Sequence, residues 1–481
     1  MSVKNKGGVA AIIVLLVVLL VGGAVLNFTS SSSNTRTAAD NLEIDNGDTK
    51  IDWSRYETFD VALSGSYEIT KSGVYNLTGE ISDGLITVNA SKEDKVKLIL
   101  NGVTIKNSAG PAIYVVAADD TVIELAEGTE NILEDGSSYA NYDEDVKGVI
   151  FSKDDLSFTG TGKLIVTANY QDGIVSKDDL KFNSGTYVVT AKDDGIRGKD
   201  SVYIVDGDFT ISAGNKGIRS TNEERTGKGF VLVAGGKIDI TKSYEGIEAP
   251  IIKIAGGETN IVASDDGMNA GNTLLFDGGK NIIDAAGDGV DSNGAIYISG
   301  GETIIYGPTS NGDGALDSET GILQTGGKLI ALGSTGMAES MDEKSTTYSI
   351  SAYLTTSVSA GGVLAIKDAS GNAIWEVTAK KTFSHIAAGS EDLKLGETYY
   401  IYVDDVQQEE FTIEDVVTTI GSGGLTNAGG MMGGQGGNMM RGGDMEMPED
   451  VEMPEDMEMP SGEKPDDMPE MPSGGKGGSR K

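Results

Sequence analysis

Aspartates recur about 22 residues apart in the middle of the chain, in short segments that contain no lysine or arginine. Carboxylate and amide oxygens are the ligands that Ca²⁺ prefers, at about six to eight oxygens per ion. If the segments stack, like charges about 5 Å apart repel by roughly 3 kcal/mol per pair, unless protons or a cation intervene. We therefore predict a calcium site formed by Asp265, Asp266, Asn269, Asp288, Asp291, Asp313 and Asp317.

A second row of aspartates lies at Asp154, Asp178 and Asp200, in related Ser-Lys-Asp-Asp and Lys-Asp-Ser units. Each unit carries its own lysine, so these carboxylates could be neutralised without a metal. Calcium held by the same type of ligand is the alternative interpretation.

Two arginines on consecutive repeats, Arg197 and Arg219, suggest a different chemistry. A guanidinium binds a carboxylate through two parallel hydrogen bonds, so two arginines could clamp an acidic ligand. Together with Asp194 and Lys216 they form our candidate ligand site. In the other interpretation, each arginine neutralises the aspartates beside it.

Adjacent Asp-Asp pairs occur at residues 154, 178, 193 and 265. A glycoside hydrolase needs one protonated and one ionised carboxyl group, and such a pair need occur only once. Recurrence therefore indicates a scaffold motif, and we assign no catalytic residue. His385 is the single histidine, which argues against a Ser-His-Asp triad and against a histidine-rich metal site.

These residues belong to a repeat marked by glycines. Glycines in units such as Asp-Gly-Ile, from Gly173 to Gly314, follow one another at 22, 22, 29, 21, 22 and 25 residues. A second series, in which each glycine ends a Gly-Gly pair, runs from Gly236 to Gly327. Short β-branched runs lie between the two series. The pattern predicts an all-β fold, a right-handed parallel β-helix with one coil per roughly 22 residues and coils about 4.8 Å apart.

Glycine suits the corners of such coils because it adopts positive φ at no steric cost. After the Gly-Gly corner the charge alternates from coil to coil, and opposite charges on neighbouring strands are worth roughly 0.2–1 kcal/mol each. We predict that this ladder is structural and faces outward; it consists of Asp208, Lys237, Glu258, Lys280, Glu302 and Lys328. Counted from the preceding glycine, Asp317 is one residue out of step with Asp291, which predicts a small bulge.

The remaining segments differ in composition. Residues 1–30 contain an uncharged run after Lys4 and Lys6, which predicts a transmembrane helix that anchors an exported chain, with a cleaved signal segment as the alternative. Residues 31–52 form a linker, 53–344 the β-helix, and 345–420 a small antiparallel β module on its C-terminal end. Residues 421–481, rich in Gly, Met, Pro and Asp, predict a disordered tail.

The 481 residues carry a net charge of −37 and no cysteine. Phosphate recognition requires lysine and arginine, so the charge argues against nucleic-acid partners. Without cysteine, disulfides and zinc–thiolate sites are excluded. We expect a monomer.

Several recurring units together resemble one family: Lys-Asp-Asp-Leu, Asp-Asp-Gly-Ile, Gly-Lys-Asp-Ser and Asp-Gly-Val-Asp-Ser-Asn-Gly. It is the bacterial extracellular carbohydrate-binding β-helix family, and the resemblance covers residues 63–403. The resemblance implies a right-handed parallel β-helix similar to polysaccharide lyases, bound calcium, and affinity for plant or acidic polysaccharide. The tail and the scarcity of aromatic residues on the repeats depart from the family pattern.

The sequence therefore predicts a non-catalytic, cell-surface protein that binds polysaccharide. The expected ligand is an acidic plant-type glycan, such as pectin, or else cellulose. One alternative is a polysaccharide lyase acting on uronic-acid polymers, with Arg197 or Arg219 as the base. The other is a surface stalk or adhesin scaffold in which calcium is purely structural.

Overall fold

The computed structural model describes residues 42, 50–225 and 227–421. The predicted anchor at 1–30 and the predicted tail after residue 421 lie outside these residues. Within them, no helix is long and apolar enough to cross a membrane. One short 3₁₀ helix, η2 (Trp53–Arg55), precedes the first strand.

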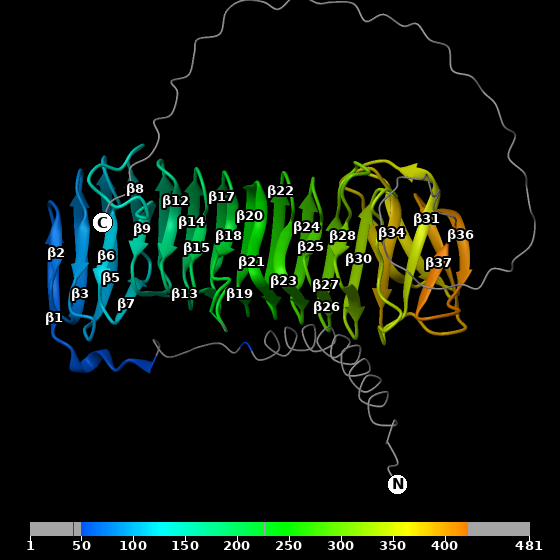
Figure 1. The fold of residues 1–481 in the computed structure, drawn as a ribbon, viewed down its shortest axis with the longest axis horizontal. Coiled ribbons are helices and arrows are strands. Elements are labelled where there is room, and N and C mark those ends of the chain that lie inside the picture. The colour runs from blue at the N-terminus through cyan, green and yellow to red at the C-terminus, as the bar shows by residue number, and fades with distance from the viewer. Residues whose placement is uncertain (1–41, 43–49, 226, 422–481) are drawn as a thin grey trace, which may run out of the picture. The chain divides into compact units, whose positions relative to one another are not determined.

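The described chain coils repeatedly through three walls of parallel strands, so that each strand pairs with its equivalents one coil before and one coil after (Figure 1). The first wall comprises β1 (Thr58–Leu63), β3 (Gly73–Ile81), β5 (Lys95–Asn107), β7 (Asp120–Leu125), β10 (Asp155–Gly160), β13 (Asp179–Phe182), β16 (Ser201–Ile204), β19 (Phe230–Val233), β26 (Ala295–Ile298) and β29 (Gly321–Gln324). The second comprises β8 (Glu130–Asp135), β11 (Lys163–Ala168), β14 (Thr186–Ala191), β17 (Asp208–Ala213), β20 (Lys237–Ser243), β22 (Glu258–Ala263), β24 (Lys280–Ala285), β27 (Glu302–Tyr306) and β30 (Lys328–Gly333).

The third wall comprises β2 (Tyr67–Ile69), β4 (Ile86–Asn89), β6 (Ile113–Ala117), β9 (Gly148–Ser152), β12 (Asp172–Ser176), β15 (Ile196–Gly198), β18 (Lys216–Ser220), β25 (Val290–Ser292) and β28 (Leu316–Ser318). Strands β3 and β5 continue from the first wall into the second, whereas β21 (Glu245–Ile254) and β23 (Met268–Phe276) continue from the third into the first. The prediction of an all-β, β-helix-like stack of coils is confirmed.

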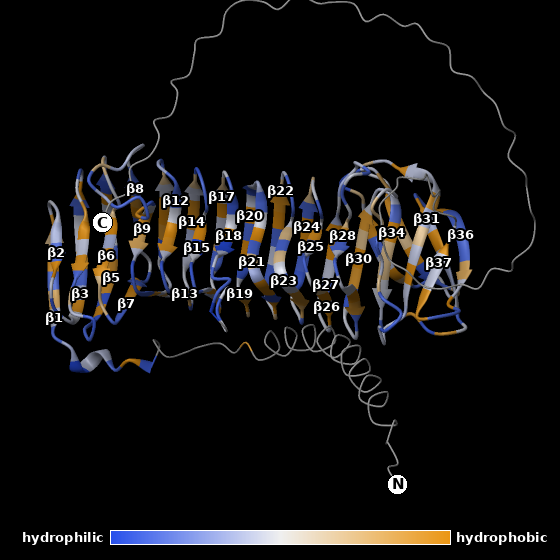
Figure 2. Cartoon of the chain, viewed as in Figure 1, coloured by the Kyte–Doolittle hydropathy of each residue, from blue (hydrophilic) through white to orange (hydrophobic). Residues whose placement is uncertain are grey.

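The core lies inside the stack, where equivalent apolar residues pile up coil upon coil. Figure 2 shows hydrophobic and hydrophilic residues mixed along the strands, because alternate side chains of a strand face inward and outward. One such pile on the third wall is almost fully buried: Ile174, Ile196, Ile218, Ile247, Met268, Val290 and Leu316. Burial of each such side chain is worth roughly 1.5–3 kcal/mol, which makes stacking the main source of stability.

The two glycine series serve different purposes. The Gly-Gly series adopts the predicted left-handed backbone, for example φ +78° at Gly236 and +79° at Gly257. The Asp-Gly-Ile series does not, and here the explanation by positive φ is wrong. A Cβ at Gly195 would lie 2.6 Å from the Gly217 carbonyl oxygen and 2.7 Å from Ile211 Cγ2. Close approach between coils excludes a side chain there.

The C-terminal end of the stack is covered on every wall. Strand β34 (Phe383–Ser390) pairs antiparallel with β30, and β31 (Ser349–Val358) and β37 (Val417–Ile420) follow it in the same sheet. Backbone and side-chain groups of residues 342–346 bond to β29, and the Glu339 side chain accepts the Ser318 N–H of β28 at 3.2 Å.

The expected antiparallel module is present as a separate sheet in the order β33-β32-β35-β36. Its strands are β32 (Val363–Asp368), β33 (Ala373–Thr378), β35 (Thr398–Val403) and β36 (Val406–Thr412). His385 lies on β34, 2% exposed, with Nε2 3.0 Å from Ser351 Oγ, and burial lowers its pKa to about 4. The histidine is a neutral structural residue.

Candidate functional site

The outward-facing side chains of the third wall form one continuous row, which we call the outer column. Strand register places its members directly opposite one another on successive coils: Val175, Arg197, Arg219, Glu248, Asn269, Asp291 and Asp317. Asp317 is in register with Asp291, so the predicted bulge between them is absent, because Val290 pairs with Leu316. The extra residue before Asp317 lies in the turn and not in the strand.

The four residues of the predicted ligand site come together on neighbouring coils. Arg219 lies 3.5 Å from Asp194 and 3.2 Å from Glu248, and Lys216 lies 2.6 Å from Glu245. Arg197 instead contacts Asp172, Nη2 to Oδ2, at 2.8 Å. The structure thus supports the interpretation in which the arginines neutralise carboxylates of the scaffold.

The partner aspartates of these arginines are deeply buried. Asp172 is completely buried, and this burial raises its pKa to about 7 against the attraction of Arg197. Asp194 is 1% exposed; its pKa is raised by burial and by the adjacent Asp193. Removal of either arginine would leave a buried carboxyl group without its main counter-ion.

A shallow polar depression of about 500 Å³ runs beside this part of the outer column. Its floor and walls combine charged, amide and hydroxyl groups, including Arg219, Glu248, Asn269, Asn272 and Asn293. Such groups donate and accept hydrogen bonds in several directions, as a ring of hydroxyl groups requires.

Further along, three carboxylates converge where the second wall turns into the third. Glu245, Asp265 and Asp266 each offer an oxygen within 4.8 Å of the others. Glu245 Oε2 is buried without a hydrogen-bond partner. A Cβ at Gly287 would lie 2.6 Å from Asp266 Oδ1 and 2.8 Å from Asp265 Oδ1, so the glycine keeps this space open. The oxygen-only donor set and the orphaned oxygen fit a hard cation such as Ca²⁺.

The acidic row continues toward the C-terminal end. Burial, and then the neighbouring carboxylates, raise the pKa of Asp266, Asp288 and Asp291 to about 6 each. Backbone N–H groups hold two of them, since Asp266 accepts from Asp288 at 2.8 Å and Asp288 from Gly314 at 2.6 Å. In the described part of the chain, none of these three carboxylates has a lysine or arginine partner within 4 Å.

Other members of the predicted metal set are placed less tightly. Asn269 Nδ2 lies 3.4 Å from Asp266 Oδ2, at the margin of the cluster. Asp313 accepts from Ser310 Oγ at 3.0 Å, although its charge still acts on Asp288. The sequence reasoning missed Glu339, whose pKa is raised to about 7 by burial and then by Asp317.

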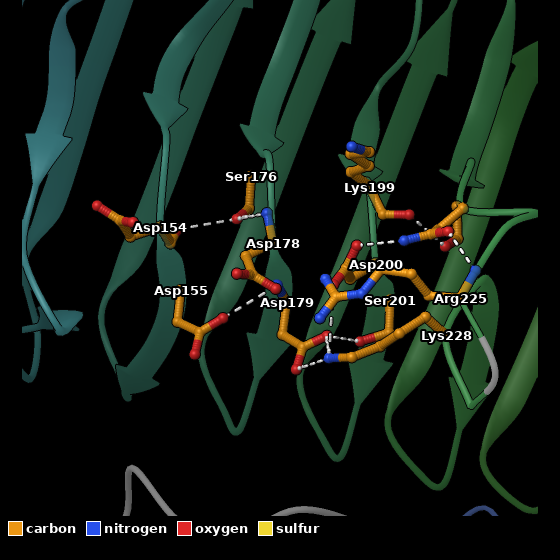
Figure 3. A network of polar contacts seen from close by, with 12 residues as sticks. Asp154, Asp155, Ser176, Asp178, Asp179, Lys199, Asp200, Ser201, Arg225 and Lys228 are labelled. Atoms are coloured by element: carbon orange, nitrogen blue, oxygen red, sulfur yellow. Dashed lines mark hydrogen bonds and ion pairs between the residues drawn. The ribbon is translucent and has the colours of Figure 1, made fainter.

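Two cations, Arg225 and Lys228, reach the aspartates at one end of the second aspartate row (Figure 3). Asp154 pairs with Lys92 at 3.4 Å, and Asp200 pairs with Arg225 at 2.6 Å and Lys228 at 3.7 Å. Asp178, Asp155 and Asp179 offer three oxygens within 4.8 Å of one another. Burial and then Asp200 raise the pKa of Asp178 to about 6.

The sequence suggested that each lysine of this row neutralises the aspartates of its own unit, but the structure shows other partners for Lys153 and Lys177. Lys153 instead pairs with Asp143 at 3.8 Å and Lys177 with Asp145 at 3.0 Å. Arg225 and Lys228, which serve the row, come from the long connection between β18 and β19. The 29-residue interval between Gly217 and Gly246 indicates this insertion in the sequence. The length of the interval alone does not predict which carboxylates Arg225 and Lys228 pair with.

Residues 64–252 and 250–394 match the family described as carbohydrate-binding domain-containing protein. A protein of that description from Acetivibrio thermocellus is 46% identical over 185 residues, which is 38% of this chain and 65% of the relative. A solved structure described as a polysaccharide lyase-like protein from C. thermocellum, a gadolinium derivative, aligns with TM-score 0.42 and 30% identity over 50% of this chain and 96% of the other. Because the family match extends over well more than half of the sequence, the chain belongs to the carbohydrate-binding domain-containing family.

Proposed function

We propose that the protein is an exported, non-catalytic, cell-surface polysaccharide-binding protein, and that the third wall is its binding face. The observation that carries the proposal is the polar depression beside Arg219, Glu248 and Asn269, on a face whose outer column continues in register from Arg197 to Asp317. An open, polar and elongated face suits a linear glycan better than a small molecule, which favours enclosed pockets. Family membership supports the same ligand class.

The favoured ligands are acidic plant-type glycans such as pectin, with cellulose as the neutral alternative. Ca²⁺ is the proposed cofactor, held by Glu245, Asp265 and Asp266, with Asp288 and Asp291 beside them. Bound there, the ion would supply positive charge within the acidic half of the face and could bridge to a carboxylate of the glycan.

Arg219 argues against the lyase alternative. A catalytic base must lose its proton, but Arg219 lies between two carboxylates, Asp194 and Glu248, whose charges raise its pKa. Arg197 is likewise committed to buried Asp172. Scaffold carboxylates therefore hold both arginines in place, which leaves neither available as the base of a lyase.

Several further features belong to the same proposal. The β-helix is right-handed, the hand that connections between parallel strands adopt almost without exception. Residues 1–30 anchor the exported chain in the cytoplasmic membrane and 31–52 link it to the β-helix at 53–344. Residues 345–420 form the capping module, 421–481 the tail, and the protein acts as a monomer.

The test is retention of the purified protein on insoluble pectin and on cellulose, with Ca²⁺ and with a chelator. We expect stronger retention on pectin with Ca²⁺ than with the chelator, without release of unsaturated or reducing-end products. Unsaturated products absorbing in the ultraviolet would establish a lyase instead. Failure to bind any glycan would leave the stalk or adhesin scaffold.

A further inference from the structure

Three lysines stand one above another at the end of consecutive third-wall strands. Lys153, Lys177 and Lys199 each follow a residue of the register Ser152–Ser176–Gly198, and Lys177 and Lys199 donate their backbone N–H to the preceding coil. Neighbouring coils of such a stack are about 4.8 Å apart. An aspartate follows each of these lysines directly in the chain, so this lysine row lies beside Asp154, Asp178 and Asp200 on the proposed binding face.

The row borders a hollow of about 460 Å³ that is lined by both apolar and charged residues. Its lining consists of Val116, Val146 and Phe151, the lysines Lys92, Lys153 and Lys177, and the carboxylates Asp143, Asp145 and Asp154. Lys153 Nζ also lies 5.7 Å from the centre of the Tyr114 ring. A sugar ring that carries a carboxylate can pack against the apolar stems of these lysines while its carboxylate pairs with their ammonium groups.

A short acidic arch, Asp143–Asp145, lies over this hollow. Its three residues are exposed, and it spans two anchors. On one side, the Tyr142 ring packs against Gly110 and the Tyr139 hydroxyl donates to Gly148 O at 2.9 Å. On the other, Val146 is 2% exposed beneath the arch. Between these anchors the arch is exposed, and the Val146 N–H donates to the Asp143 carbonyl oxygen at 2.9 Å.

The arch places its carboxylates on the lysine row. Asp143 lies 3.8 Å from Lys153, and Asp145 lies 3.0 Å from Lys177. The Asp145 side chain is 74% exposed, yet Lys177 first and then Arg197 and Lys147 hold its pKa below the usual range. Lys199 is exposed and makes no ion pair within the described residues.

We propose that the lysine row is a carboxylate-binding subsite for an acidic glycan, and that the Asp143–Asp145 arch is a built-in competitor that occupies it in the free protein. This inference rests on the proposed function and adds to it a second site, one that needs no calcium. A glycan with one carboxylate per ring meets one lysine per coil when it lies along the stack. Its carboxylates displace Asp143 and Asp145, whose exposed ion pairs are individually weak.

The experiment measures binding of an oligogalacturonate by calorimetry in the presence of a chelator. The D143N/D145N variant keeps the shape of the arch and removes its charge, and we expect it to bind roughly three- to tenfold more tightly than the unaltered protein. The K153Q/K177Q/K199Q variant should bind on the order of tenfold more weakly. As a matched control, K237Q/K280Q alters two exposed lysines of the second-wall ladder and should change nothing. Thermal unfolding of each variant verifies its fold.

The outcomes separate this inference from the proposed function. If neither the arch variant nor the lysine variant changes the affinity for the oligogalacturonate, the subsite is overturned. The proposal of polysaccharide binding would remain. Binding by the arch variant alone supports the competitor. An equal gain for a DNA oligonucleotide overturns the ligand class, because it would reveal a general anion site. No glycan binding by any form, with or without Ca²⁺, overturns both.

Discussion

At the scale of single residues, Arg219 distinguishes a scaffold role from a ligand clamp. The R219A substitution leaves Asp194 buried without its nearest cation, while Glu248 keeps Lys216 at 3.2 Å, and it should lower the free energy of unfolding by about 1–3 kcal/mol. The cost stays below that of a fully buried pair because Asp194 still accepts from Asn215 Nδ2 at 3.0 Å. Urea unfolding measures the loss, and R219K, which keeps the charge, should restore part of it. Unchanged stability with lost glycan binding would instead make Arg219 a ligand clamp.

The acidic row predicts an unusual pH dependence. Asp266, Asp288 and Asp291 have a folded pKa of about 6 and Glu339 of about 7, all above the unfolded values near 4. Their contribution to stability is complete below about pH 4 and is lost as the pH rises through 6 to 7. With chelator present, these groups therefore favour a higher melting temperature near pH 5 than near pH 7.5.

Calcium should reverse that trend, because it binds the ionised carboxylates. Stabilisation by Ca²⁺ is expected to be larger near pH 7.5 than near pH 5, as measured by calorimetric melting. His385, whose lowered pKa of about 4 acts in the opposite sense over this range, is the same with and without Ca²⁺ and cancels from the difference. Equal stabilisation at both pH values would contradict a site built from these carboxylates.

At the scale of strands and turns, the corner at Gly287 tests where the cation binds. The G287A substitution adds a methyl group directly against Asp265 and Asp266. We expect it to abolish most of the calcium-induced rise in melting temperature, with a smaller effect on the calcium-free protein. The control is G271A, at an exposed position where a Cβ would meet its nearest neighbour at 3.4 Å. If both variants retain the full response to Ca²⁺, the ion binds elsewhere.

The regular elements were predictable because the repeat itself encodes their register. The alternating ladder from Asp208 to Lys328 pairs on successive second-wall strands as expected. Its charges form no ion pair with one another within 4 Å in the described residues, so their energy lies at the low end of the expected range. Asp265 and Asp266, which the sequence assigned to the predicted metal site, likewise lie in an acidic cluster.

Residues from irregular segments could not be placed in the same way. Glu339 covers the end of β28, Arg225 and Lys228 lie on an insertion, and Asp145 lies on the arch. Each reaches its partner through a turn whose path depends on tertiary packing, which no local period records. The sequence also assigned Lys153 and Lys177 to the nearest aspartates, whereas their side chains reach the arch instead.

At the scale of the molecule, charge is distributed unevenly along the third wall. Cations from Lys153 to Arg219 occupy the earlier coils, and carboxylates from Asp265 to Glu339 the later ones. Loss of Ca²⁺ should therefore loosen the stack unevenly. Amide hydrogen exchange in chelator should accelerate more in β22 to β30 than in β3 to β8, because only the later coils contain the repelling row. Uniform acceleration would indicate that calcium acts on folding of the whole stack.

The covered end of the stack also governs how such a molecule can change length. Strand β30 is closed by antiparallel β34, whereas in the described chain β1 pairs only with β3 and β2 only with β4. A duplicated coil inserted between two existing coils would find matching neighbours above and below, whereas no further parallel strand can be added after β30, because antiparallel β34 already pairs with its outer edge. Insertion or deletion of whole coils would therefore change the length of the scaffold in steps of about 4.8 Å, while its C-terminal end stays the same. Related proteins that differ by whole coils would then contact correspondingly different numbers of sugar rings along a bound glycan.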